Sequence, residues 1–143
     1  MTIPDLSGIV TVLNTPFTES GDIDARSMRA HVEYALDAGV AGFLVPAMAS
    51  EVSKLSESER SALVTTVIEA VDGRVPVIGG ASHPDEAART RITRALVDRG
   101  CDGVLVSLRY ESDARYESDV RRIADLNPPF LMLQDWDATG RGL

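Results

Sequence analysis

The chain has 143 residues, 44% of them hydrophobic and 25% charged, which is typical of one globular domain with its own core. Its formal net charge of −8 argues against nucleic acid or an anionic membrane surface as its main partner, because both favour basic patches. The lone Cys101 cannot form an internal disulfide, and neither a membrane span nor an export signal is found, so we expect a cytoplasmic protein.

Continuous apolar runs alternate with segments of helical periodicity along the chain. In chain order the predicted elements are a strand at 8–14, a helix at 24–38, a strand at 42–47, a helix from Ser56, a strand at 75–80, a helix from Ser82 to Gly100, a strand at 103–108, a helix at 114–126 and a strand at 128–135.

The helix boundaries carry capping signals. Asp24 stands before the first helix and Gly39 follows it. Ser56-Glu57-Ser58-Glu59 has the form of a capping box, in which a hydroxyl and a carboxylate satisfy free amides reciprocally. Pro84 stands near the first turn of the third helix, where a missing amide costs nothing. The predicted buried positions of the last three helices are Leu63, Val64, Val67, Ile68, Val71, Ala88, Ile92, Ala95, Leu96, Val120, Ile123 and Ala124.

The strands are continuously apolar, which is typical of strands buried on both faces of a parallel sheet. GVAG (39–42) and GCDG (100–103) both join a helix end to a strand start, and the repeat of about 30 residues suits a βαβ unit. We therefore predict one α/β domain over residues 1–143. Periodicity leaves two architectures open, an open doubly wound parallel sheet or the first half of a (β/α)₈ barrel.

Several motifs, taken in order, resemble the first half of the dihydrodipicolinate synthase and N-acetylneuraminate lyase family. These motifs are GIVTVLNTPF (8–17), GDID (21–24), GVAGFLV (39–45), LSESER (55–60), GRVPVIGGAS (73–82) and GCDGVLV (100–106). The similarity runs in register over essentially the whole chain, about half of a usual family member. It implies an α/β fold of the (β/α)₈ TIM-barrel type, with this chain covering about the first four and a half βα units.

The resemblance also implies a reaction. Members of the family are class I aldolases, in which a lysine forms a Schiff base with pyruvate or a related small oxo acid. Such a reaction needs an unprotonated amine, donors for the oxo-acid carboxylate and a hydroxyl relay for protons. We expect no cofactor, and no metal site either, because His31 and His83 lie far apart and have no Cys, Glu or Asp at ligand spacing. The resemblance implies a homo-oligomer. The family's lysine lies on the sixth strand, and Lys54, the only lysine here, is expected to be a protonated surface residue.

The turn after the second strand reads Ala47-Met48-Ala49-Ser50-Glu51, where the family usually has Gly-Thr-Thr-Gly-Glu. By resemblance, Met48, Ala49, Ser50 and Glu51 bind the substrate, with backbone amides facing its carboxylate. The relay hydroxyl has nevertheless become Ala49, and Met48 adds apolar bulk. A loop that merely packs, with Glu51 as an exposed carboxylate near a helix start, explains the same residues.

After the fourth strand the family usually has Thr-Pro-Tyr-Tyr, and this chain has Ser107-Leu108-Arg109-Tyr110. One relay tyrosine therefore survives as Tyr110, which is the predicted catalytic residue. Arg109 departs from the family pattern. It either binds an acidic substrate group through both guanidinium nitrogens or pairs with Glu111 or Asp113 on the surface.

After the fifth strand the family has Tyr-Asn-hydrophobic-Pro-x-Arg-Thr-Gly. In the matching stretch the catalytic tyrosine has become Leu133 and the arginine has become Ala138. Gln134 and Asp135 offer a different polar lining, with Asp135 as a candidate base. A turn of solvated polar residues is the simpler interpretation.

Two function hypotheses follow. The first is the N-terminal part of a divergent oxo-acid-dependent lyase or synthase, inactive as this fragment because the imine lysine is absent. The second is a non-catalytic half-barrel that serves as a binding or assembly module. In that case the first and last strands are unpaired edges, and such edges associate with other chains.

Overall fold

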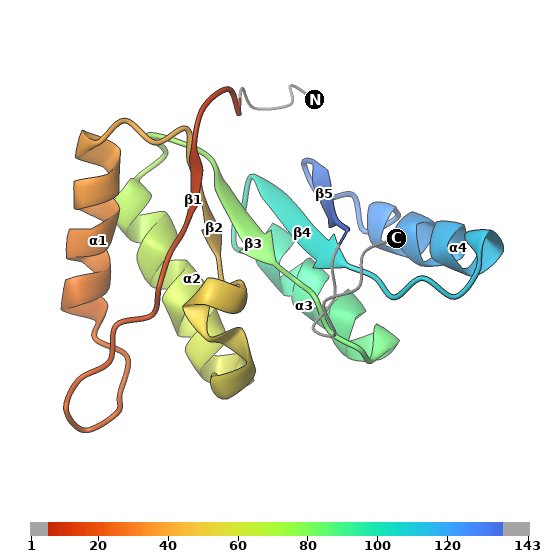
Figure 1. The fold of residues 1–143 in the computed structure, drawn as a ribbon, viewed down its shortest axis with the longest axis horizontal. Helices are drawn as coiled ribbons and strands as arrows, with labels where there is room; N and C mark the ends of the chain where they lie inside the picture. The colour runs from red at the N-terminus through yellow and green to blue at the C-terminus, as the bar shows by residue number, and fades with distance from the viewer. Residues whose placement is uncertain (1–5, 136–143) are drawn as a thin grey trace. The chain divides into compact units, whose positions relative to one another are not determined.

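The computed structural model describes residues 6–135, in which strands and helices alternate along the chain (Figure 1). The strands are β1 (Val10–Val12), β2 (Gly42–Val45), β3 (Val77–Gly80), β4 (Gly103–Ser107) and β5 (Leu131–Gln134). The helices are α1 (Ala25–Asp37), α2 (Glu57–Val71), α3 (Glu86–Asp98) and α4 (Asp113–Ala124). Two short 3₁₀ helices, η1 (Met48–Ser50) and η2 (Val52–Lys54), follow β2.

The five strands form one sheet in the order β1-β2-β3-β4-β5, which is also their order in the sequence. β1 pairs in parallel with β2, and β4 pairs in parallel with β5. A doubly wound sheet reverses its strand order at a switch point, whereas a (β/α)₈ barrel adds each strand beside the previous one. No reversal occurs among the described strands. The barrel-type prediction is therefore confirmed, and the doubly wound alternative is wrong.

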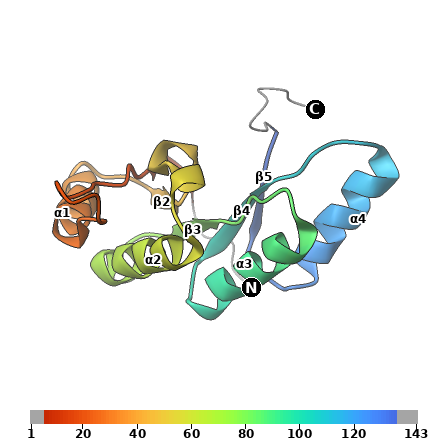
Figure 2. The same ribbon diagram turned by 90° about the horizontal axis from the view of Figure 1, so that it is seen from below.

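The chain divides within β3 into two compact units, the first of which spans Pro4–Ile78. In this unit α1 and α2 lie side by side (Figure 1, Figure 2). The start of α1 confirms the predicted cap, because Asp24 Oδ1 accepts hydrogen bonds from the amides of Arg26 and Ser27 at 3.0 Å. Met28, one turn further on, is fully buried in the apolar cluster of this unit.

The start of α2 confirms the predicted capping box. The hydroxyl of Ser56 accepts a hydrogen bond from the amide of Glu59 at 3.3 Å, and the Glu59 carboxylate accepts one from the amide of Ser56 at 2.7 Å. Of the five residues predicted to be buried on this helix, only Ile68 is partly exposed. The buried ones are Leu63, Val64, Val67 and Val71.

The second compact unit begins at Gly79 and contains α3, β4, α4 and β5. Its most buried strand is β4, in which Val104 and Val106 are completely inaccessible to solvent. Close packing at the start of β4 requires a glycine. A Cβ atom on Gly103 would lie 2.3 Å from the ring of Phe130, far inside contact distance.

The start of α3 differs from the prediction. The helix begins at Glu86, with Asp85 as its cap, and Asp85 Oδ1 accepts a hydrogen bond from the amide of Ala88 at 2.7 Å. The predicted opening at Ser82-His83-Pro84 is therefore wrong. The carboxylate of Asp85 satisfies a free amide of the first turn, which makes it a good capping residue one position after the proline.

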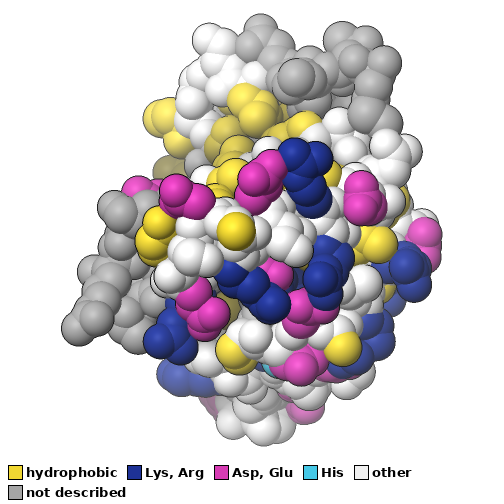
Figure 3. All heavy atoms as spheres, turned by 90° about the vertical axis from the view of Figure 1, so that its right-hand side faces the viewer, with side chains coloured by type: hydrophobic (Ala, Val, Ile, Leu, Met, Phe, Trp, Pro, Cys, Tyr) yellow, Lys and Arg dark blue, Asp and Glu magenta, His cyan; other side chains and the backbone are white. Residues whose placement is uncertain are grey.

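The face by which α3 packs also differs from the prediction, because it includes polar side chains. Arg89 and Thr93 on α3 and Asp119 on α4 are all buried. The predicted buried residues that are exposed or only partly buried are Ile92, Ala95, Val120 and Ala124. On the outer side of α4, acidic and basic side chains are interspersed (Figure 3).

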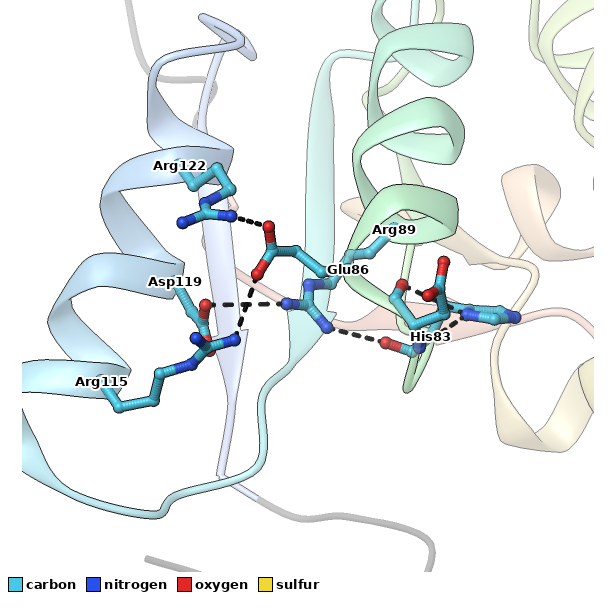
Figure 4. A network of polar contacts seen from close by, with 7 residues as sticks. His83, Glu86, Arg89, Arg115, Asp119 and Arg122 are labelled. Atoms are coloured by element: carbon cyan, nitrogen blue, oxygen red, sulfur yellow. Dashed lines mark hydrogen bonds and ion pairs between the residues drawn. The ribbon is translucent and has the colours of Figure 1, made fainter.

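A polar network fastens α3 to α4 (Figure 4). Arg89 Nη2 lies 4.0 Å from Asp119 Oδ1, and Arg89 Nη1 donates a hydrogen bond to the carbonyl of His83 at 2.8 Å. Arg115 donates to both helices, through Nε to Asp119 Oδ2 and through Nη2 to Glu86 Oε2, each at 3.1 Å. Both members of the Arg89–Asp119 pair are more than nine-tenths buried, so the carboxylate of Asp119 supplies a compensating charge for Arg89, while Asp119 is itself compensated by both Arg89 and Arg115. Within residues 6–135, no helix is both long and apolar enough for a membrane span.

Candidate active site

The candidate residues follow the carboxyl ends of β2, β4 and β5, which is the end of the strands where barrel enzymes hold their active sites. They belong to both compact units. The turn Ala47–Glu51 lies in the first unit, and Arg109, Tyr110, Gln134 and Asp135 lie in the second.

Ser50 holds the turn after β2 to the end of β1. Its side chain is completely buried, and its hydroxyl donates a hydrogen bond to the carbonyl of Leu13 at 2.5 Å. The same hydroxyl accepts from the amide of Ala47 at 3.0 Å, and Thr15 Oγ1 donates to the carbonyl of Ser50 at 2.6 Å. With its hydroxyl committed to backbone groups, Ser50 orients the turn.

Met48 and Ala49 form the exposed part of this turn, and Met48 is 55% accessible to solvent. Among the residues that the structure describes, the backbone amides of Met48 and Ala49 have no hydrogen-bond partner. Free amides of this kind are donors for an anionic oxygen.

Glu51 closes the turn with φ of 56°, in the left-handed region, and its carboxylate pairs with Lys54. The Lys54 side chain is 73% exposed. It is therefore solvated and paired, as expected for a surface lysine, and it lacks the buried setting that an imine-forming amine requires.

Tyr110 is half exposed and is held by the first residue of α4. Its Oη donates a hydrogen bond to Asp113 Oδ1 at 2.7 Å, and its ring lies 6.1 Å from the ring of Tyr116. The hydrogen bond and the negative charge of Asp113 raise the pKa of the Tyr110 phenol above its ordinary value. Asp113 was not predicted as a partner of this tyrosine. Its position three residues after Tyr110, next to the predicted start of a helix, could have indicated this contact.

Arg109 is exposed next to Tyr110. Neither predicted partner, Glu111 or Asp113, pairs with its guanidinium in the described part of the chain. The carboxylate of Asp113 is engaged by Tyr110 instead.

Gln134 ends β5 and lies opposite Ser107, the last residue of β4. Gln134 and Asp135 are both exposed, and Leu133, which stands where the family has a tyrosine, is 44% exposed. The exposed side chains at this strand end are thus an amide, a carboxylate and an apolar group, and Asp135 has an interaction partner of its own. Ala138 lies outside the described residues.

Two other kinds of site were considered, a metal site and a reactive cysteine. Within residues 6–135, no three His, Cys, Asp or Glu side chains are grouped so that they could hold a metal ion. Burial, followed by the charge of Asp102, raises the pKa of the Cys101 thiol to about 12, so this thiol is not a nucleophile at neutral pH.

Comparison with known proteins gives consistent matches over this chain. The model of the dihydrodipicolinate synthetase family matches residues 5–111. A 4-hydroxy-tetrahydrodipicolinate synthase from Salinibacter ruber is 35% identical over 99 residues, which cover 69% of this chain and 33% of that protein. The similar synthase from Methanoculleus marisnigri is 28% identical over 141 residues, covering 95% of this chain and 48% of that protein.

Solved structures agree with the sequence matches. A dihydrodipicolinate synthase from Bacillus anthracis is 30% identical, with a TM-score of 0.88, and the match covers 96% of this chain and 48% of that one. YagE, a prophage protein of the dihydrodipicolinic acid synthase family from Escherichia coli, was solved in complex with pyruvate. It is 29% identical, with a TM-score of 0.82, over 88% of this chain and 43% of its own. The chain thus spans about a third to a half of the length of these relatives.

Proposed function

Because the chain belongs to the dihydrodipicolinate synthetase family, we propose that it is the N-terminal part of an oxo-acid-dependent lyase or synthase. The reaction is an aldol-type cleavage or formation of a carbon–carbon bond through a lysine Schiff base. Pyruvate or a similar small oxo acid is the substrate, a choice supported by the pyruvate bound to YagE. The imine lysine belongs to a sixth strand outside these 143 residues, because Lys54 is solvated and paired with Glu51.

The turn after β2 is the observation that carries this proposal. The amides of Met48 and Ala49 are free to donate to the oxo-acid carboxylate, and preorganised donors of this kind stabilise an anion at no cost of rearrangement. Ser50 holds the two amides in place through its bonds to Leu13 and Ala47. The substrate is therefore bound mainly by backbone, which explains how a turn without the family's threonines can still bind it.

Proton transfer falls to Tyr110, with Asp113 as the acceptor that orients its phenol. Gln134 and Asp135 line the end of β5, and Asp135 is a second candidate base. Leu133 replaces the family's catalytic tyrosine, so proton transfer is expected to be slower than in members that have it.

Borohydride trapping tests the proposal. The natural product of the gene is incubated with pyruvate and sodium borohydride, and its intact mass is measured with and without each reagent. Reduction of an imine adds the pyruvate carbon skeleton to one lysine irreversibly, so an adduct on a lysine outside residues 1–143 is the expected result. An adduct-free protein, with a native mass of 15.4 kDa, would rule out the class I mechanism.

The exposed apolar residues of the outer strands support a second candidate function. Ile9, beside β1, is 72% exposed, and Leu133 in β5 is 44% exposed. Apolar edges of this kind associate with other chains, which suits an assembly module and also the homo-oligomer implied by the family resemblance. A native mass of 15.4 kDa together with a defined homo-oligomer in light scattering would favour this function over the lyase.

A further inference from the structure

Three polar atoms on the buried faces of α3 and α4 have no hydrogen-bond partner within residues 6–135. They are Arg89 Nε, Thr93 Oγ1 and Asp119 Oδ1. Thr93 is completely inaccessible to solvent, and the side chains of Arg89 and Asp119 are 7% and 8% exposed. Buried polar atoms in folded proteins are almost always hydrogen-bonded, because burying one unpaired costs free energy. Three such atoms on two packed helices therefore point to a further group that bonds to them.

The three side chains belong to one helix contact. Arg89 and Thr93 are four residues apart on α3, so they lie one turn apart on the same face of that helix. Asp119 faces Arg89 from α4 (Figure 4). Arg89 Nη2 lies 4.0 Å from Asp119 Oδ1, which is longer than a hydrogen bond, so these two groups do not bond directly. Polar groups at such a separation are often bridged by a water molecule.

The hydroxyl of Thr93 is free for such a bridge. A helical threonine can donate to the carbonyl four residues before it, as Thr65 on α2 does to the carbonyl of Ser61 at 3.0 Å. Thr93 Oγ1 makes no bond of this kind to the carbonyl of Arg89. Its hydroxyl can therefore donate and accept within the contact between the helices.

The charges around the three atoms select a neutral ligand. Arg89 Nε is only a donor, and the ionised carboxylate of Asp119 is only an acceptor. The Arg89 guanidinium would repel a cation, and the Asp119 carboxylate would repel an anion. The next charged groups outward, Arg115 and Glu86, are of opposite sign and bond to each other at 3.1 Å. The ligand is therefore small, uncharged and able to donate and accept at once.

We propose that Arg89, Thr93 and Asp119 form a binding site for one structural water molecule, which joins α3 to α4. The water accepts a hydrogen bond from Arg89 Nε, donates one to Asp119 Oδ1 and forms a third with Thr93 Oγ1. About three bonds of this kind are typical of a buried water. All three residues belong to the second compact unit, and the site does not depend on the proposed reaction.

Relaxation dispersion of ¹⁷O in water tests the proposal, because it counts the long-lived internal water molecules of a protein. We expect the natural, full-length protein to hold one more of them than its Thr93→Val variant, which keeps the shape of the side chain but lacks the hydroxyl. Thr93→Ser keeps the hydroxyl and should retain the water. Thr65→Val removes an exposed hydroxyl on α2 and should leave the number unchanged.

Urea unfolding of the same variants gives a second answer, whose sign separates the two cases. If the water is bound, Thr93→Val removes one of its bonds, and the equilibrium constant for unfolding should rise roughly fivefold. If the Thr93 hydroxyl is instead buried without a partner, its replacement by a methyl group removes a cost, and the constant should fall. A lower unfolding constant in Thr93→Val, or as many long-lived waters in this variant as in the natural protein, would overturn the proposal.

Discussion

Thr15 and Ser50, which lie 35 positions apart in the sequence, are joined by a 2.6 Å hydrogen bond from the Thr15 hydroxyl to the Ser50 carbonyl. The Ser50 hydroxyl in turn donates a hydrogen bond to the carbonyl of Leu13, two residues before Thr15. Two strand ends are thereby held together by reciprocal bonds in a fully buried setting. The exposed residues Met48 and Ala49 thus directly precede a residue that is bonded to the end of β1.

Ser50→Ala should destabilise the protein by about 1–3 kcal/mol, because it leaves the buried carbonyl of Leu13 and the partly buried amide of Ala47 without their partner. Urea denaturation measures the change. Ser53→Ala is the matched control, since Ser53 is exposed in η2 and should tolerate the same change. Equal stability of the two variants would show that the Ser50 hydroxyl does not hold the turn.

The sequence predicted the features that depend on neighbouring residues. The caps at Asp24 and Ser56 are local, because the side chain that satisfies the first turn stands within three residues of the amides it bonds. The apolar strands and their sequential order also follow from periodicity and the family resemblance. The capping of α3 by Asp85 was missed because a nearby proline gave a competing signal.

The polar contacts between distant segments could not be predicted in this way. Arg89 and Asp119 are charged residues that periodicity assigns to an exposed face, and their burial is tolerable because they face each other and bond to the His83 carbonyl and to Arg115. Likewise, the sequence alone suggests that Ser50 binds the substrate. Its role in holding the turn is evident only from the hydrogen bond that Thr15, beyond the end of β1, donates to it.

Gly103→Ala should destabilise the protein by about 1–3 kcal/mol through overpacking, because the new Cβ atom would overlap the Phe130 ring. Thermal and urea unfolding measure the loss. The double variant Gly103→Ala with Phe130→Leu should be more stable than the sum of the single effects predicts, because the smaller side chain leaves room for the methyl group. Strict additivity would contradict a direct clash.

Asp119→Ala should cost about 3–5 kcal/mol, because it leaves the buried guanidinium of Arg89 without a compensating charge. Glu117→Ala, which removes an exposed ion pair on the same helix, should change stability little. Replacing both partners, Arg89→Met with Asp119→Leu, should be less destabilising than Asp119→Ala alone. A larger loss in the double variant would mean that the pair stabilises the fold by more than mutual neutralisation.

Cys101 should resist thiol reagents in the folded protein. With a pKa of about 12, roughly one thiol in ten thousand is ionised at pH 8, and the residue is also buried. The rate of reaction with a chromogenic disulfide should rise by orders of magnitude in denaturant. Fast reaction under native conditions would show that this part of the second unit opens readily.

The contact between Tyr110 and Asp113 predicts a pH effect whose sign is fixed. Asp113 raises the pKa of the folded phenol above its unfolded value near 10. The contact therefore contributes stability below that unfolded value and loses it as the pH rises through the folded pKa.

Asp113→Asn removes the negative charge, so the pKa of Tyr110 should fall toward its ordinary value. NMR titration of ¹³C-labelled tyrosine measures the change, with exposed Tyr34 as the internal control. An unchanged Tyr110 titration in this variant would mean that Asp113 does not hold the phenol in solution, and its place in the proposed proton transfer would be lost.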